Sequence, residues 1–153
     1  MSQPIDRAGA FGQNLYLDTR GTGGEPISFT KAVVNGLAPG GGLYVPEQLP
    51  SLSIDDIAAL AELPYAQRAA AIYRAFNIDL ADEVIDELME RAYGNNFDTE
   101  AVCPITSLDE STHILELWHG PTSAFKDMAL QCLPHFFSAS AEHLREQGKL
   151  DHE

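Results

Sequence analysis

Residues 113–127 read HILELWHGPTSAFKD, and the predicted fold rests mainly on this segment. Residues 113–118 form a short, largely apolar run with a β-branched residue, which is typical of a buried strand. Gly120 and Pro121 then favour a turned or extended backbone, because proline fixes its own φ and restricts the residue before it. The stretch therefore predicts a strand that ends in a tight turn.

A helix is expected directly after this turn. Thr122 or Ser123 can cap the helix, because their hydroxyls accept hydrogen bonds from backbone N–H groups two or three residues on. Asp127 falls in the first helical turn, where the helix dipole favours negative charge. A strand, a tight turn and a helix N-terminus form the usual ligand site of open α/β sheets, at the carboxyl end of a strand.

Lys126 lies at the mouth of the predicted helix. A lysine at its ordinary pKa of about 10.4 is almost wholly protonated at neutral pH and cannot form an imine. Burial behind a strand end and the positive pole of the helix both disfavour the ammonium form. A neutral amine can condense with an aldehyde, and pyridoxal phosphate is the commonest aldehyde cofactor that lysines hold. The alternative is that Lys126 is an ordinary solvated lysine at a helix terminus.

The residues around Lys126 resemble a known signature. Residues 119–127, HGPTSAFKD, closely resemble the pyridoxal-phosphate lysine motif of threonine synthases. Residues 16–21, YLDTRG, and residues 36–46, GLAPGGGLYVP, resemble two further blocks of that family in the same order and spacing. Gly40 departs from the family pattern, which usually has an Asp there. The resemblance spans nearly the whole chain.

This resemblance implies the type II fold of pyridoxal-phosphate enzymes, and the conversion of O-phospho-L-homoserine and water to L-threonine and phosphate. Lys126 would hold the cofactor as an imine, release it to the substrate amine, and then move protons among the α, β and γ positions of the substrate. Phe125 and Asp127 would position the cofactor or the lysine, with packing and helix capping as equally open roles. Thr122 and Ser123 would supply polar contacts to the cofactor.

Arg20 and His119 also match the family blocks, but the sequence assigns them no chemistry. Arg20 is open to two roles, because its guanidinium could meet a substrate phosphate or pair with one of the many carboxylates.

The composition limits the class of partner. The chain has 153 residues and a formal net charge of −14, from 9 basic and 23 acidic side chains. This size predicts one ordinary domain with a hydrophobic core. The negative charge argues against nucleic acids and anionic membranes, because both are bound through clustered Lys and Arg. No apolar run approaches the roughly 20 residues of a membrane span, and no signal peptide is recognisable. We therefore expect a cytoplasmic protein that binds a small molecule.

The cysteines and histidines predict neither a disulfide nor a metal site. Cys103 and Cys132 lie far apart in the chain, which favours reduced thiols. The five histidines do not cluster with cysteines or carboxylates at the spacings of metal ligands. No bound metal is expected.

The N-terminal third of the chain predicts a small sheet. Residues 1–13 have no periodicity and are expected to form a flexible leader. Residues 14–49 are rich in Gly and Pro and contain short β-type runs at 15–17 and 43–45, which predict strands joined by turns.

The glycines at residues 40–42 suggest a phosphate loop at first sight. They lack the Lys-Ser or Lys-Thr that should follow them, and Pro46 prevents a helix from starting directly behind them. These glycines therefore predict a tight turn.

Three helices are predicted next, one from Ile54, one near residues 65–76 and one near residues 81–93. Ser53 and Asp56 have the spacing of a capping box at the first helix. Pro64 is suited to the first turn of the second helix, and Gly94 is expected to end the third. The third helix should bury an apolar stripe made of Val84, Ile85, Leu88, Met89 and Ala92.

A last helix is predicted from about Ser123 to Gln147, with Gly148 past its end. Pro134 lacks an amide N–H, and its ring would clash with the carbonyl four residues earlier. It therefore predicts a kink or break near residues 130–133.

The expected fold class is mixed α/β, with two parts. Residues 14–100 are expected to form an accessory domain of a small sheet plus helices, and residues 101–153 to begin the catalytic domain with its first strand–helix unit. In the threonine synthase family the phosphate loop and the partner of the pyridine nitrogen come later than these residues. The chain is thus interpreted as an N-terminal fragment that is inactive alone. The strand at 113–118 lacks parallel neighbours, which favours self-association.

Two other functions stay open. A phospho-lyase on the same scaffold would release phosphate without making threonine. A non-catalytic helical interaction module would keep the lysine motif as a vestige.

Overall fold

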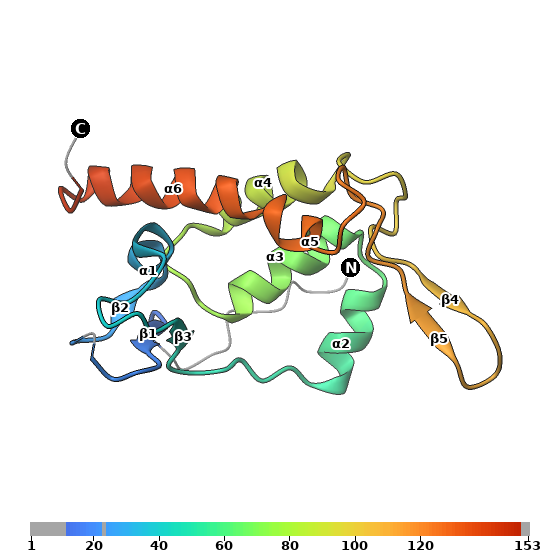
Figure 1. The fold of residues 1–153 in the computed structure, drawn as a ribbon, viewed down its shortest axis with the longest axis horizontal. Helices are drawn as coiled ribbons and strands as arrows, with labels where there is room; N and C mark the ends of the chain where they lie inside the picture. The colour runs from blue at the N-terminus through green and yellow to red at the C-terminus, as the bar shows by residue number, and fades with distance from the viewer. Residues whose placement is uncertain (1–11, 23, 151–153) are drawn as a thin grey trace.

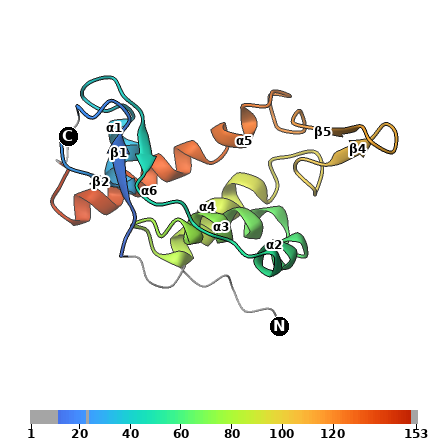
Figure 2. The same cartoon turned by 90° about the horizontal axis from the view of Figure 1, so that it is seen from below.

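The computed structural model describes residues 12–22 and 24–150, so the predicted leader lies outside the described residues except at its last two positions. The described part is mixed α/β, as predicted. Its elements are β1 (Leu15–Asp18), β2 (Ile27–Ser28), α1 (Phe29–Asn35), β3 (Tyr44–Pro46), α2 (Ile54–Ala61), α3 (Tyr65–Ala75), α4 (Asp82–Tyr93), β4 (Ile105–Ser107), β5 (His113–Leu115), α5 (Asp127–Leu130) and α6 (Leu133–Glu146). Figures 1 and 2 show α3 and α4 between a small sheet at one end and a β-hairpin at the other, with α6 extending along α1 at the end where the sheet lies. None of these helices is long and apolar enough to cross a membrane.

The small sheet predicted for the N-terminal third is confirmed. Strand β1 is central and pairs antiparallel with β2 and β3, so that Leu17 lies opposite Val45. Helix α1, which follows β2 directly, was not predicted. Ser28 caps α1 by accepting a hydrogen bond from the N–H of Lys31. Two helical turns among Gly and Pro are too short for a helical period to stand out in the sequence.

Residues 40–42 form a turn, as predicted. The N–H of Ala38 donates to the carbonyl of the last glycine at 3.0 Å, and Gly41 has a φ of +75°. A Cβ added to the first or last glycine would lie 1.7 or 1.8 Å from a side-chain oxygen of Thr22 or Asp18. The side chains of Thr22 and Asp18 therefore occupy the space beside the turn, which leaves no room for a phosphate.

The three helices predicted after the sheet are present as α2, α3 and α4. The predicted capping box is formed: the N–H of Asp56 donates to Ser53 Oγ at 3.1 Å, and the N–H of Ser53 donates to Asp56 Oδ2 at 2.8 Å. Pro64 directly precedes α3, and Gly94 follows α4. Local sequence signals therefore set the ends of these helices.

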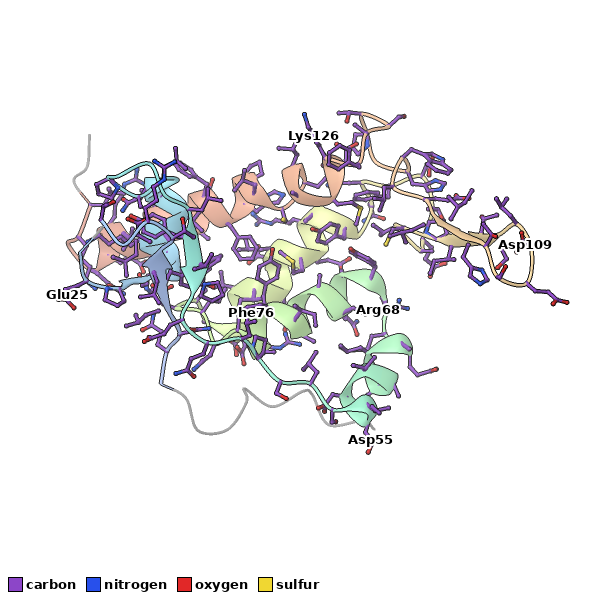
Figure 3. The ribbon with its side chains drawn as sticks, turned by 60° about the horizontal axis from the view of Figure 1, so that its bottom comes forward. Glu25, Asp55, Arg68, Phe76, Asp109 and Lys126 are labelled. Carbon is purple, nitrogen blue, oxygen red and sulfur yellow. The ribbon has the colours of Figure 1, made fainter. Side chains whose placement is uncertain are left out.

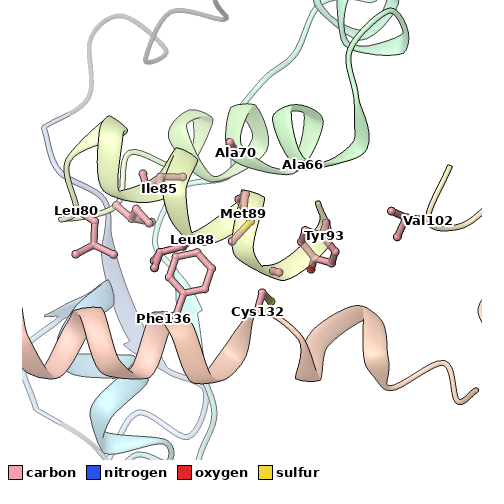
Figure 4. Close-up of a cluster of buried hydrophobic side chains, with 12 residues drawn as sticks. Ala66, Ala70, Leu80, Ile85, Leu88, Met89, Tyr93, Val102, Cys132 and Phe136 are labelled. Atoms are coloured by element: carbon pink, nitrogen blue, oxygen red, sulfur yellow. The ribbon is translucent and has the colours of Figure 1, made fainter. Parts of the chain in front are cut away.

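One hydrophobic core joins α3, α4 and α6 (Figure 4). Ile85 and Met89 of α4 are fully buried in it, together with Ala70 of α3 and Phe136 of α6. The ring of Phe136 also packs edge-on against Phe29 of α1, with the ring centroids 5.3 Å apart. The C-terminal helix thus completes the core of the N-terminal segment. The domain boundary near residue 100 stays a prediction.

The last helix is broken where Pro134 predicted a break. Helix α5 ends at Leu130 and α6 begins at Leu133, so Pro134 falls in the first turn of α6. A missing amide N–H is harmless there, because the first N–H groups of a helix have no intrahelical partner. Gly148 follows the end of α6 with a φ of +67°, as expected for a residue that terminates a helix.

The prediction of a buried strand at 113–118 is wrong in this structure. Only His113–Leu115 forms a strand, β5, which pairs antiparallel with β4 in a hairpin that projects from the helices (Figure 1). All residues of both strands are exposed, including Leu115 at 52%. Apolar composition favours burial only where a second layer covers the strand, and the described residues place none over this hairpin.

Candidate active site

The motif at residues 119–127 folds as successive turns that lead into α5. The N–H of Ser123 donates to the carbonyl of Gly120, and the N–H of Asp127 donates to that of Ala124, each at 3.0 Å. Ser123 has a φ of +54°, a left-handed conformation that costs energy for a residue other than glycine. The predicted helix start near Ser123 is therefore wrong, because these turns delay α5 to Asp127. We call residues 119–127 the lysine turn.

Lys126 directly precedes α5, and its side chain is exposed (Figure 3). The predicted burial behind a strand end is wrong here, because β5 already ends at Leu115, within the exposed hairpin. The backbone of Lys126 is held, since its carbonyl accepts the N–H of Leu130 at 2.8 Å and that of Ala129 at 3.0 Å. An accessible amine on a fixed backbone is suited to reach a ligand from solvent.

Asp127 organises the lysine turn from the inside. Its side chain is fully buried, and Oδ2 accepts the N–H of Thr122 at 2.8 Å and the hydroxyl of Thr122 at 2.9 Å. Burial by itself raises the pKa of Asp127, but these hydrogen bonds and one from Gln131 outweigh it, so the pKa lies below its usual value. The predicted capping role of Thr122 or Ser123 is wrong, because the backbone N–H of Thr122 donates to the carboxylate of Asp127, and neither hydroxyl caps α5.

Gly120 allows Asp127 to take this position. A Cβ added at Gly120 would lie 2.4 Å from the Cβ of Asp127 and 2.6 Å from its Oδ2. Any larger residue would push the carboxylate away from the turn. This close approach explains why the turn contains a glycine before its proline.

Helix α5 is fastened to the core by polar contacts. The hydroxyl of Tyr93, at the end of α4, donates to the carbonyl of Met128 at 2.7 Å. Burial raises the pKa of Tyr93, so the hydroxyl keeps the proton that this bond requires. The thiol of Cys132 donates to the carbonyl of Ala129 at 3.2 Å, and Cys103 and Cys132 are both free, as predicted.

His119 holds the start of the lysine turn. Its Nδ1 lies 2.5 Å from Asp98 Oδ1, and its Nε2 lies 2.7 Å from Glu116 Oε2. Hydrogen bonds to Glu116 and Asp98 raise the pKa of His119. Hydrogen bonds from Thr106 and His119 lower the pKa of Glu116. His119 has no predicted role, and neither acid is among the predicted site residues. The Glu three residues before the His was a usable signal, but Asp98 lies in a distant connector.

The structure brings together most of the predicted site residues, since the lysine turn also carries Thr122, Ser123 and Phe125. The ring of Phe125 is 65% exposed beside Lys126. Arg20 is not part of this group. It follows β1 of the small sheet, and its Nη1 donates to the carbonyl of Gly40 at 3.1 Å. Figure 1 shows this sheet at the end of the molecule opposite the hairpin, away from α5.

Proteins of known family are similar in sequence to this chain. A family model described as threonine synthase N terminus matches residues 15–93. The chain is 42% identical over 119 residues to threonine synthase of Pseudomonas aeruginosa, an alignment that covers 77% of this chain and 25% of that protein. It is 39% identical over 113 residues to threonine synthase-like 1 of Homo sapiens, covering 72% of this chain and 15% of the human protein.

A solved structure shares the fold. The crystal structure of pyridoxal-phosphate-bound threonine synthase from Brucella melitensis matches with a TM-score of 0.78 and 34% sequence identity. The match covers 89% of this chain and 28% of that chain. The chain therefore spans about a quarter of the length of the threonine synthases that it matches.

Proposed function

Because the chain belongs to the threonine synthase family, we propose that it serves as the N-terminal part of a pyridoxal-phosphate-dependent enzyme that converts O-phospho-L-homoserine and water to L-threonine and phosphate. The observation that carries this proposal is the lysine turn, which holds an accessible amine on a fixed backbone. The fold similarity to a pyridoxal-phosphate-bound threonine synthase over 89% of the chain supports it.

The residues of the lysine turn fit the cofactor. Pyridoxal phosphate, when bound, offers an aldehyde carbon and draws electrons from the substrate attached to it. Lys126 supplies the amine, Thr122 and Ser123 supply hydroxyls, and the exposed ring of Phe125 supplies an aromatic surface. The filled turn at residues 40–42 does not fit the phosphate. We expect the phosphate group and the ring nitrogen to be held by a further part of the enzyme.

Lys126 acts through its Nζ atom. The amine must lose a proton before it can attack an aldehyde carbon, since only the neutral form is a nucleophile. The same Nζ would also move protons among the α, β and γ carbons of a bound substrate, because a neutral amine can accept a proton and an ammonium can donate one. Asp127 takes no part in these transfers, because its carboxylate is buried and bonded to Thr122. Its role is to hold the backbone that carries Lys126.

A second candidate function is a phospho-lyase on the same scaffold, which would release phosphate from the same substrate without forming threonine. This chain is 39% identical to threonine synthase-like 1, a relative whose name differs from that of the synthase itself. This similarity supports the second candidate. Both functions release phosphate, and the formation of threonine distinguishes them.

A chimera tests the reaction. Residues 12–150 of this chain replace the matching N-terminal quarter of the P. aeruginosa enzyme, and threonine and phosphate are both measured. We expect equal amounts of the two products, and neither from the Lys126→Ala chimera. Lys149→Ala is the matched control, because Lys149 is also exposed but lies beyond α6, and this variant should stay active. Phosphate without threonine would establish the lyase instead, and normal turnover by Lys126→Ala would refute the role of the lysine.

The chain by itself is expected to release no phosphate from O-phospho-L-homoserine and to bind pyridoxal phosphate weakly. Lysine condensation alone gives weak and unspecific binding, because specificity needs backbone N–H groups around the phosphate. Titration with pyridoxal phosphate measures this directly. Tight, saturable binding that disappears in Lys126→Ala would contradict the expectation.

A further inference from the structure

The ring of His119 lies between two carboxylates, an arrangement that the proposed function does not use. Nδ1 faces Asp98 Oδ1 at 2.5 Å, and Nε2 faces Glu116 Oε2 at 2.7 Å. An ionised carboxylate can only accept hydrogen bonds, so each ring nitrogen must donate one. A neutral imidazole has a single N–H. The geometry therefore requires the imidazolium form, with both nitrogens protonated.

This arrangement, which we call the His119 clamp, joins three separate segments of the chain. Asp98 belongs to the connector after α4, Glu116 directly follows β5, and His119 begins the lysine turn. A backbone hydrogen bond of 3.0 Å from the N–H of Asp98 to the carbonyl of His119 also joins the connector to the lysine turn. Glu116 is fixed in turn by the hydroxyl of Thr106 on β4 at 2.5 Å.

The clamp is partly shielded from water. The side chains of His119 and Glu116 are each 17% exposed, while that of Asp98 is 73% exposed. The indole of Trp118 stacks on the His119 ring, with centroids 5.6 Å apart. Asp98 and Glu116 are the charged groups that contact His119 in the described part of the chain. The Glu116 side of the clamp is therefore expected to be the stronger one, because water screens it less.

A short run of contacts connects the clamp to Lys126. Gly120, next to His119, lies so close to Asp127 that it has no room for a Cβ. The carboxylate of Asp127 in turn holds Thr122. The lysine turn is thus fixed at its start by His119 and at its end by Asp127, and Lys126 lies directly before the second anchor.

We propose that His119 is a positioning residue: as an imidazolium held between Asp98 and Glu116, it sets the place of the turn from which Lys126 reaches its ligand. The inference rests on the proposed function only for its effect on the chemistry of Lys126. Loss of a proton from His119 removes one of the two donors, so one carboxylate is released and the turn loosens as the pH rises.

NMR titration of the whole chain tests the clamp without any assay of activity. Glu116→Gln and Asp98→Asn each remove one carboxylate, and Glu110→Gln is the matched control, because Glu110 is an exposed acid of the same hairpin. We expect the His119 ring to titrate with a midpoint above the ordinary 6.5, lower in both clamp variants and unchanged in the control. The backbone amide of Thr122 should shift with the same midpoint as the ring. A His119 midpoint at or below 6.5 would overturn the inference. A Thr122 amide whose chemical shift does not change with the titration of His119 would overturn it as well.

The chimera then tests the effect on Lys126. The fall of kcat at high pH should move to lower pH in Glu116→Gln by as much as the NMR midpoint moves, with KM little changed. Glu110→Gln should leave the profile as it is. A midpoint that moves while the kcat profile stays in place refutes the positioning role. If the unmodified chimera makes no product, the proposed function fails, and the NMR titration alone decides whether the clamp exists.

Discussion

Two regions of this chain are held together in different ways. We call the sheet with α1, α3, α4 and α6 the body, and residues 104–130, which contain the hairpin, the lysine turn and α5, the lysine arm. The body buries its apolar side chains: Ile85 and Met89 are 0% exposed. The lysine arm leaves large apolar side chains in contact with water, such as Ile105 at 67% and Phe125 at 65%.

The stability of the chain and the order of the candidate site therefore depend on different forces. Apolar burial stabilises the body, since each fully buried large side chain contributes about 1.5–3 kcal/mol. The lysine arm is ordered by hydrogen bonds at Asp127, His119 and Tyr93. A change in the body should therefore unfold the chain, whereas a change in the arm should disturb Lys126 and leave the body intact.

A pair of phenylalanines gives the largest expected contrast. Phe136→Ala should lower the free energy of unfolding by about 3–5 kcal/mol, because it empties a site that is 3% exposed in the core. Phe125→Ala removes the same ring from an exposed position and should cost less than about 0.5 kcal/mol. Urea unfolding followed by circular dichroism measures both. Equal losses would remove the distinction between body and arm.

Gly120→Ala should have an intermediate effect, confined to the arm. The new Cβ would overlap Asp127, and overpacking of this kind typically costs about 1–3 kcal/mol. Because the arm adds little to the core, most of this strain should appear as lost protection of the Thr122 and Asp127 amides in hydrogen exchange. Unchanged protection at these amides would show that the close approach is not required.

The junction between arm and body should tolerate the loss of its proline. Pro134→Ala should change the free energy of unfolding by less than about 0.5 kcal/mol, because the first turn of α6 needs no amide donor there. Ala139→Pro, in the middle of α6, is the control and should cost about 3 kcal/mol or more. Thermal or urea unfolding of the two variants compares them. A large loss in Pro134→Ala would mean that Pro134 itself enforces the break.

The two regions should also respond differently to pH, and the effects of pH on their stability should be smaller than those of the substitutions. The pKa of His119 is raised in the folded chain. Its contribution to stability is therefore complete below pH 6.5, and it is lost as the pH rises through the pKa of the folded state. The pKa of Asp127 is lowered in the folded chain. Its contribution to stability is therefore present above the ordinary pKa of 3.8, and it is lost as the pH falls through the pKa of the folded state.

In the body, burial raises the pKa of Tyr16 and of Tyr65 to about 12, so their contribution is complete below pH 10. Amide exchange measured against pH should therefore show the arm loosening at a lower alkaline pH than the body. Simultaneous loss of protection in both regions would contradict this order.

Much of the fold outside the lysine arm could be predicted from the sequence. The capping box of Ser53 and Asp56, the turn at residues 40–42 and the break at Pro134 all depend on groups within about four residues of each other. The site was predicted less well. Lys126 and its neighbours were found from their motif, but the exposure of Lys126 and the inward position of Asp127 were not expected, because both depend on what packs against the turn.

Local conformations of this protein follow from the sequence where proline rings, glycine backbones and capping side chains act on their immediate neighbours, as at Pro134, residues 40–42 and Ser53. The presence of α1 and the start of α5 do not follow in this way. Tertiary packing, in contrast, sets the return of α6 that completes the core with Phe136 and the exposure of the apolar strand β5. It also brought Asp98 to His119 from a connector far away in the chain. Such contacts follow from which surfaces meet after folding, and short-range sequence patterns carry no record of that.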